Sequence, residues 1–160
     1  GLAQLFGMPF VVLRKPVPFD TTTLNFNWQV WDTKAFSLYS RSTEKIDKKG
    51  ADMAIAAVCR FLSRMNVLNY NVYGGYESTV LIEEELVSLR STASGLYIPH
   101  VKSFDSVERG QVLADIIDPL TGVTVAQTEA PEDGIVFFAK DSPLVMENET
   151  LFKIVNKLHK

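Results

Sequence analysis

The sequence has 160 residues, of which 46% are apolar and 22% charged, as expected for one folded domain or two small ones. The formal net charge is -3 and basic residues are not clustered, so nucleic acid is not an expected partner. The single cysteine, Cys59, excludes an internal disulfide and fits a reducing compartment. No apolar run reaches the roughly 18 residues needed to cross a bilayer. We therefore expect a cytoplasmic protein without a membrane segment.

The first part of the chain alternates between strand and helix signals. Gly7 is suited to a left-handed helix cap, and Asp47 is suited to an N-cap. The predicted elements, in chain order, are the last turn of a helix at Leu2–Gly7, a strand at Phe10–Arg14, a short helix capped by Thr22 or Thr23 and ending near Val30 or Trp31, a strand at Lys34–Tyr39, and a helix at about 48–65.

The helix at 48–65 is predicted from apolar residues that recur at helical spacing, which should form its buried face. Cys59 lies beside this face, and we interpret it as a small buried hydrophobic residue. The residues of the face are Ala51, Ala54, Ile55, Val58, Phe61, Leu62 and Met65.

Alternating strands and helices predict a parallel sheet covered by helices. Two strands cannot close such a core, because parallel sheets are covered on both faces and usually have more strands. We therefore expect this chain to be the C-terminal part of a larger protein. A linker rich in Asn, Gly and Tyr at 69–77 divides the expected α/β region, 1–76, from a second region, 77–158.

The second region contains strand signals at Ser78–Glu84 and Leu86–Ser91, followed by a strand–turn–strand pattern that is written twice within Gly95–Val155. Gly110 and Asn148 occupy equivalent turn positions, and both residue types tolerate a left-handed backbone. The repeat predicts two interlocked halves related by a quasi-two-fold axis.

This pattern resembles the barrel-sandwich hybrid of lipoyl and biotinyl carrier domains. Gly110–Ile116 and Asn148–Ile154 match the turn and strand of each half, and Ala130–Gly134 matches the step into the second half. A carrier displays a lysine on its central hairpin, but the tip here, Asp118–Gly122, contains none. We expect a carrier-like all-β fold without lipoate or biotin.

The order of an α/β region followed by a carrier-like β region resembles the succinylglutamate desuccinylase/aspartoacylase family of zinc-carboxypeptidase-like, metallopeptidase-like hydrolases. The matching segments are Leu5–Leu13 with its Phe-Gly-x-Pro pattern, Lys34–Tyr39 followed by Ile46-Asp47, the helix at 48–65, Ser94–Tyr97, and Val107–Leu113.

The resemblance implies a zinc-dependent deacylase that removes an acyl group from an N-acyl amino acid. In such a family zinc activates water, and a nearby carboxylate acts as the base. The zinc ligands, a His-x-x-Glu pair and a later His, belong to the N-terminal half of the family's catalytic domain. Neither His100 nor His159 lies in such a motif. We expect this chain alone to bind no zinc and to need that N-terminal half as a partner.

Candidate site residues follow the Lys34–Tyr39 strand. Tyr39 stands where the family usually has glutamate, so Glu44 is the candidate general base, with Tyr39 as a second polar site residue. Arg41 is the candidate ligand for a substrate carboxylate, because guanidinium groups bind carboxylates in bidentate fashion. The alternatives are that Glu44 is a solvated loop acid and that Tyr39 is an ordinary sheet residue.

Two other groups have simpler interpretations. His100 is expected to be a surface or turn residue, and Glu83–Glu85 a solvated charge run or the rim of a cleft. A non-catalytic binding or adaptor module with a carrier-like fold is the competing function, and a carrier domain proper is the third. The sequence leaves open whether the protein forms a homo-oligomer.

Overall fold

The computed structural model describes residues 1–39, 46–71 and 74–156. Its internal contacts divide the chain into two units, Gly1–Glu83 and Glu84–Lys160. The division falls later than the expected 76/77 boundary, because the strand at Thr79–Ile82 pairs with a strand of the first unit. Within the described residues, no helix is both long and apolar enough to cross a membrane.

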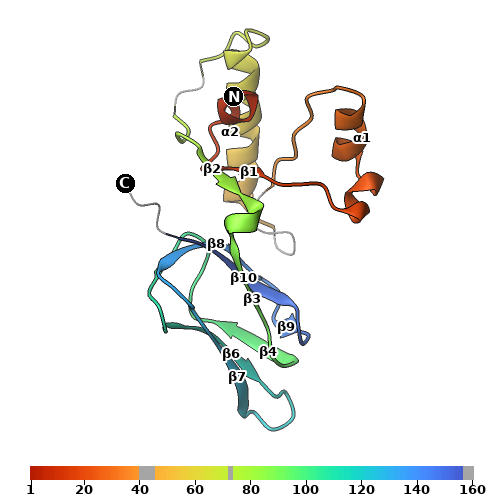
Figure 1. Ribbon diagram of the computed structural model, residues 1–160. Helices are drawn as coiled ribbons and strands as arrows, with labels where there is room; N and C mark the ends of the chain where they lie inside the picture. The colour runs from red at the N-terminus through yellow and green to blue at the C-terminus, as the bar shows by residue number, and fades with distance from the viewer. Residues whose placement is uncertain (40–45, 72–73, 157–160) are drawn as a thin grey trace. The chain divides into compact units, whose positions relative to one another are not determined.

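The first unit contains two short strands, two α-helices and 3-10 helices (Figure 1). Gly7 follows the first 3-10 helix with φ 62°, which confirms it as a left-handed cap. Thr23 caps α1 by accepting a hydrogen bond from the Phe26 N–H at 3.3 Å, as predicted. The elements are η1 Leu2–Phe6, β1 Phe10–Leu13, η2 Pro18–Thr22, α1 Leu24–Val30, α2 Lys48–Arg64, β2 Thr79–Ile82 and η3 Glu83–Glu85, the last of which crosses the unit boundary.

The sheet of the first unit has two parallel strands, with Phe10 opposite Thr79 and Leu13 opposite Ile82. Only Leu81 of these strands is buried, whereas Val12, Leu13, Val80 and Ile82 are exposed. A parallel sheet is ordinarily covered on both faces. The first unit therefore presents an open sheet whose apolar side chains remain in contact with solvent.

The prediction of a strand at Lys34–Tyr39 is wrong, because the segment forms no ladder and has an irregular conformation. An extended segment becomes a strand only where it finds a partner edge, and β1 pairs instead with β2. The segment is held by an aromatic contact, since the Phe36 ring lies 5.7 Å from that of Phe6 and 6.4 Å from that of Phe61.

Helix α2 confirms the predicted helix and its cap, because the Asp47 side chain accepts a hydrogen bond from the Gly50 N–H at 3.0 Å. Its buried face is the predicted one only in part, because Ala57 and Arg60 are buried whereas Ile55 is 63% exposed. Arg60 donates to the Phe6 carbonyl at 3.0 Å, and Phe61 of the predicted face stacks on the Phe6 ring at 4.3 Å, so both residues hold the helix on η1.

The second unit is built from eight strands in two four-stranded sheets, ordered β3-β10-β8-β5 and β7-β6-β4-β9 (Figure 1). The two sheets do not close into one barrel within the described residues. The strands are β3 Val87–Arg90, β4 Gly95–Pro99, β5 Ser106–Val107, β6 Val112–Ile117, β7 Thr124–Glu129, β8 Gly134–Ala139, β9 Leu144–Val145 and β10 Thr150–Asn156.

The repeat produces interlocked halves, as predicted. Strand β5 of the first copy pairs with β8 of the second, and β9 of the second copy pairs with β4 of the first. Gly110 and Asn148 have φ angles of 80° and 66°, so both turn residues are left-handed. Each half thus supplies an edge strand to the sheet of the other.

The core of the second unit lies between these sheets. Gly95 and Gly134 open the two copies, and a Cβ at either position would lie 2.5 Å from a neighbouring heavy atom. At both positions a neighbouring segment lies too close for any side chain, which explains why both residues are glycine. The fully buried large side chains of the core are Val107, Leu113, Ile116, Val136, Leu151, Phe152 and Ile154.

Candidate functional site

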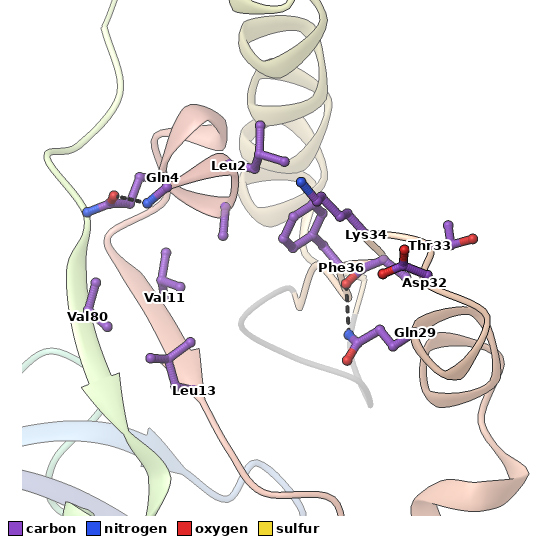
Figure 2. A pocket seen from close by; sticks show the side chains of 13 residues that line it. Leu2, Gln4, Val11, Leu13, Gln29, Asp32, Thr33, Lys34, Phe36 and Val80 are labelled. Atoms are coloured by element: carbon purple, nitrogen blue, oxygen red, sulfur yellow. Dashed lines mark hydrogen bonds between the residues drawn. The ribbon is translucent and has the colours of Figure 1, made fainter.

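The first unit contains a pocket of about 580 Å³ between η1, the β1–β2 sheet and the segment that follows α1 (Figure 2). Val11 and Val80 come from neighbouring strands, and Phe36 comes from the irregular segment. The lining residues that the structure describes are Gly1, Leu2, Ala3, Gln4, Val11, Leu13, Gln29, Asp32, Thr33, Lys34, Ala35, Phe36 and Val80.

The pocket wall is positioned by the end of α1. Asp32 adopts a left-handed φ of 60°, and its N–H donates to the Gln29 carbonyl at 3.0 Å. The Gln29 side chain then donates to the Ala35 carbonyl at 3.0 Å, as the dashed line in Figure 2 marks. These bonds turn the chain back toward η1 and bring Lys34 and Phe36 to the pocket.

The lining combines apolar side chains with a few polar groups. Lys34 and Asp32 supply one cation and one carboxylate, and Gln4, Gln29 and Thr33 supply amide or hydroxyl groups. The pocket is largely open to solvent, so it does not enclose a ligand as ordinary binding pockets do. The described lining residues include no histidine or cysteine.

The described residues do not fit a catalytic zinc site. Such a site needs three converging protein ligands, and no group of three or more His, Cys, Asp or Glu side chains that could hold a metal occurs among the residues at 1–39, 46–71 and 74–156. Cys59 is a partly buried free thiol on α2. Ligands for zinc would have to come from elsewhere.

Of the three predicted site residues, the structure describes only Tyr39, which is 78% exposed and is not among the lining residues. Glu44 and Arg41 lie outside the described residues. The pocket instead uses Lys34–Phe36, the first half of the segment from which Tyr39 was selected.

Sequence reasoning missed a buried carboxylate at Asp20. This side chain accepts the Val17 N–H at 2.7 Å and pairs with Arg14, whose guanidinium also lies 3.8 Å from Glu83. The signal was local, because an aspartate after a proline-containing turn can bind the backbone N–H groups before it.

The second unit has a polar cluster on the β7-β6-β4 surface. Asp115 accepts a hydrogen bond from Gln127 Nε2 at 2.8 Å and contacts His100 Nε2 at 2.9 Å. The Gln127 and His100 bonds hold the pKa of the Asp115 carboxyl below its ordinary value. His100 is a partly exposed surface residue, as expected, but it has a carboxylate partner that the sequence did not predict.

The resemblance to carrier domains places their modified lysine at the tip of the β6–β7 hairpin. Here Leu120 is 93% exposed at the tip. The Leu120 N–H donates to the Asp118 carboxylate at 2.8 Å, which is the main cause of the lowered pKa of that carboxyl. The tip is therefore an ordered turn without an amine.

The solved structures that the chain resembles include succinylglutamate desuccinylase/aspartoacylase family proteins. A protein of that name from Rhodobacter sphaeroides matches over 98% of this chain with a TM-score of 0.77 and 14% identity. The ectoine utilization protein EutE from Ruegeria pomeroyi matches over 94% with a TM-score of 0.76 and 13% identity. An aspartoacylase family protein from Mesorhizobium loti matches over 99% with a TM-score of 0.65 and 17% identity.

The chain spans 48%, 48% and 47% of those three structures, about half of each. No protein-family model and no curated protein matches the sequence. At such low identity the likeness concerns the fold. It confirms that the resemblance seen in the sequence extends over both units of the chain.

Proposed function

We propose that this chain is the C-terminal portion of a zinc-dependent amidohydrolase that removes an acyl group from an N-acyl amino acid or a related amide. Its partner is the N-terminal half of the same catalytic domain. The β unit shapes the cleft, and we place the protein in the cytoplasm as part of this proposal. We also interpret the second unit as a barrel-sandwich hybrid, on the strength of its exchanged edge strands.

The main support for this proposal is the open sheet of the first unit. Strands β1 and β2 pair only with each other among the described residues, and they expose apolar side chains such as Leu13, Val80 and Ile82. Solved structures of deacylase-family proteins share this fold over about half their length. A complementary half-domain would pair with the open strands and cover these side chains.

The zinc ligands in this proposal belong to the complementary half, because the described residues of this chain contain no group of three or more His, Cys, Asp or Glu side chains that could hold a metal. When bound, zinc would supply Lewis-acid activation of water. Glu44 is the proposed base, and Arg41 is proposed to bind a substrate carboxylate. Both follow from the resemblance, since they lie outside the described residues.

Co-expression with an N-terminal half from a deacylase-family protein tests the proposal. The two chains should co-purify, and the complex should hydrolyse N-acyl amino acids. The matched control is Val12→Lys with Val80→Lys, which places charges on the open sheet and should reduce co-purification. A stable complex without hydrolysis of any acyl amino acid would favour the alternative, a non-catalytic binding or adaptor module.

A further inference from the structure

Helix α1 and its C-cap carry an apolar stripe formed by Leu24, Trp28 and Trp31. These residues follow one another at spacings of four and three, so their side chains lie on one face of the helix. They are 62%, 50% and 83% exposed, and α1 buries none of its residues. Phe19 of η2, which packs against α1, is also 77% exposed. Large apolar groups that a globular fold ordinarily buries are therefore in contact with solvent here.

Amide side chains hold another side of α1 against the segment that follows the helix. Asn25 Nδ2 donates to Ser37 Oγ at 2.8 Å. Gln29 Nε2 donates to Asn25 Oδ1 at 2.7 Å and to the Ala35 carbonyl at 3.0 Å, the second of which is drawn in Figure 2. Because these bonds fix the orientation of the helix, the apolar stripe is kept on its outer side.

The length of α1 indicates that a further surface packs on this stripe. The helix has seven residues, and isolated helices of that length are not stable in water. Helices in proteins gain most of their stability by packing an apolar face. The main contact of α1 with another helix or strand is with η2, which is itself only five residues long. A partner surface on the stripe would supply the missing stabilisation.

We infer that the α1 stripe is a second docking surface for the complementary half of the catalytic domain, in addition to the open β1–β2 sheet; this inference rests on the proposed function. The chain matches the three solved structures over 98%, 94% and 99% of its own length but spans only about half of each. Those proteins therefore contain a further half that this chain does not supply. The stripe and the open sheet belong to the same unit, so one partner that completes the unit accounts for both.

Charge and size argue against two other occupants of the stripe. Residues 21–31 include no charged side chain, whereas helices that lie on membrane surfaces are rich in Lys and Arg. A stable dimer usually buries roughly 800 Å² on each copy, and a helix of about two turns offers only part of that area. The complementary half would contact the stripe together with the open sheet, so it would bury a larger surface.

Tryptophan fluorescence of the full chain tests the inference. Trp28 and Trp31 are the only tryptophans of the chain, so its emission reports on the stripe alone. The chain is co-expressed with the part of the Rhodobacter sphaeroides protein that it does not match, in which any tryptophan is replaced by phenylalanine. Co-purification measures formation of the complex. In the complex, the emission should shift to shorter wavelength and acrylamide should quench it less than in the isolated chain, because the indole rings leave solvent.

Leu24→Asp gives a second measurement that retains both tryptophans. An aspartate in the first turn of a helix is favourable to the helix, so weaker binding would not result from loss of α1. This variant should bind the partner at least about tenfold more weakly than a differently tagged wild-type chain that competes for it. Leu144→Asp is the matched control, because Leu144 is also 62% exposed but lies on β9 of the second unit. It should compete as well as wild type.

The outcomes separate this inference from the proposed function. A complex whose tryptophans remain as exposed as in the isolated chain would leave the proposed function standing and overturn the inference. An emission shift that appears as the isolated chain is concentrated would identify a second copy as the occupant. A shift on addition of phosphatidylcholine–phosphatidylglycerol vesicles would identify a lipid surface. If no complex forms, the proposed function fails and the inference fails with it.

Discussion

Asp115 shows how neighbouring polar groups set the charge of one residue. Its bonds to Gln127 and His100 lower its pKa in the folded protein. The stability it contributes is therefore present above the unfolded pKa of about 4 and is lost as the pH falls through the folded value. Asp115→Asn should lower the melting temperature near neutral pH, and its difference from wild type should shrink in acid.

Melting curves followed by circular dichroism over a pH series measure this effect. Asp52→Asn is the matched control, because Asp52 lies on the exposed side of α2. It should follow the wild-type curve at each pH. A deficit in Asp115→Asn that is the same at all pH values would contradict the electrostatic explanation.

The residues whose roles were predicted correctly from the sequence contact residues close to them in the chain. Thr23 and Asp47 each cap an amide three residues later, and Gly7 turns the backbone at its own position. The buried face of α2 could not be predicted in this way. Arg60 is buried because it donates to carbonyl groups of residues 6 and 7, and no local pattern encodes a contact over that separation.

The strands and turns of the second unit could be predicted because the sequence contains the same pattern twice. The two copies give equivalent strands, turns and opening glycines, so each copy supports the prediction for the other. The strand predicted at Lys34–Tyr39 failed because a strand depends on an available partner. The partner of β1 is β2, which the sequence placed in the other domain.

Gly95 and Gly134, the first residues of the two sequence copies, allow a test of whether the copies are structurally equivalent. A methyl group at Gly134 would lie 2.5 Å from Ile154 Cγ2, and one at Gly95 would lie 2.5 Å from the Ile117 carbonyl oxygen. Gly95→Ala and Gly134→Ala should each reduce the free energy of unfolding by about 1–3 kcal/mol through overpacking. Urea denaturation of both variants measures this, and an effect at only one position would contradict the equivalence.

The β6–β7 hairpin should carry no prosthetic group. The modification in carrier domains needs a lysine at the hairpin tip, and Asp118–Gly122 has none. Intact-mass measurement after co-expression with lipoate and biotin ligases should give the unmodified mass of the chain, while a genuine carrier domain expressed alongside should be modified. Added lipoyl or biotinyl mass on any lysine of this chain would refute the prediction.

At the scale of the whole molecule, the two units differ in how completely their cores are closed. Among the described residues, the largest fully buried side chains all belong to the second unit, while the two strands of the first unit pair only with each other. The amides of α2 should therefore exchange with solvent faster than those of β6 and β10. Hydrogen exchange with mass spectrometry measures both sets in one sample, and equal protection would show that the first unit is as stable as the second.

The isolated chain should bind zinc weakly and hydrolyse no N-acyl amino acid. The described residues contain no cluster of metal ligands, and catalytic zinc needs three. Metal analysis after dialysis should find far less than one zinc per chain. Stoichiometric zinc would show that this chain holds a metal site of its own, and the proposed division of roles between two half-domains would then fail.

In the complex with the complementary half, the proposed base can be tested directly. Replacing a general base should lower turnover by roughly 10²–10⁴-fold, so Glu44→Gln should reduce kcat by that amount while leaving zinc content and co-purification unchanged. Glu108→Gln, in the second unit, is the control and should keep wild-type turnover. If Glu44→Gln is equally active, Glu44 is a loop acid and the base lies elsewhere. If the variant also loses its zinc, Glu44 supports the metal site instead of transferring a proton.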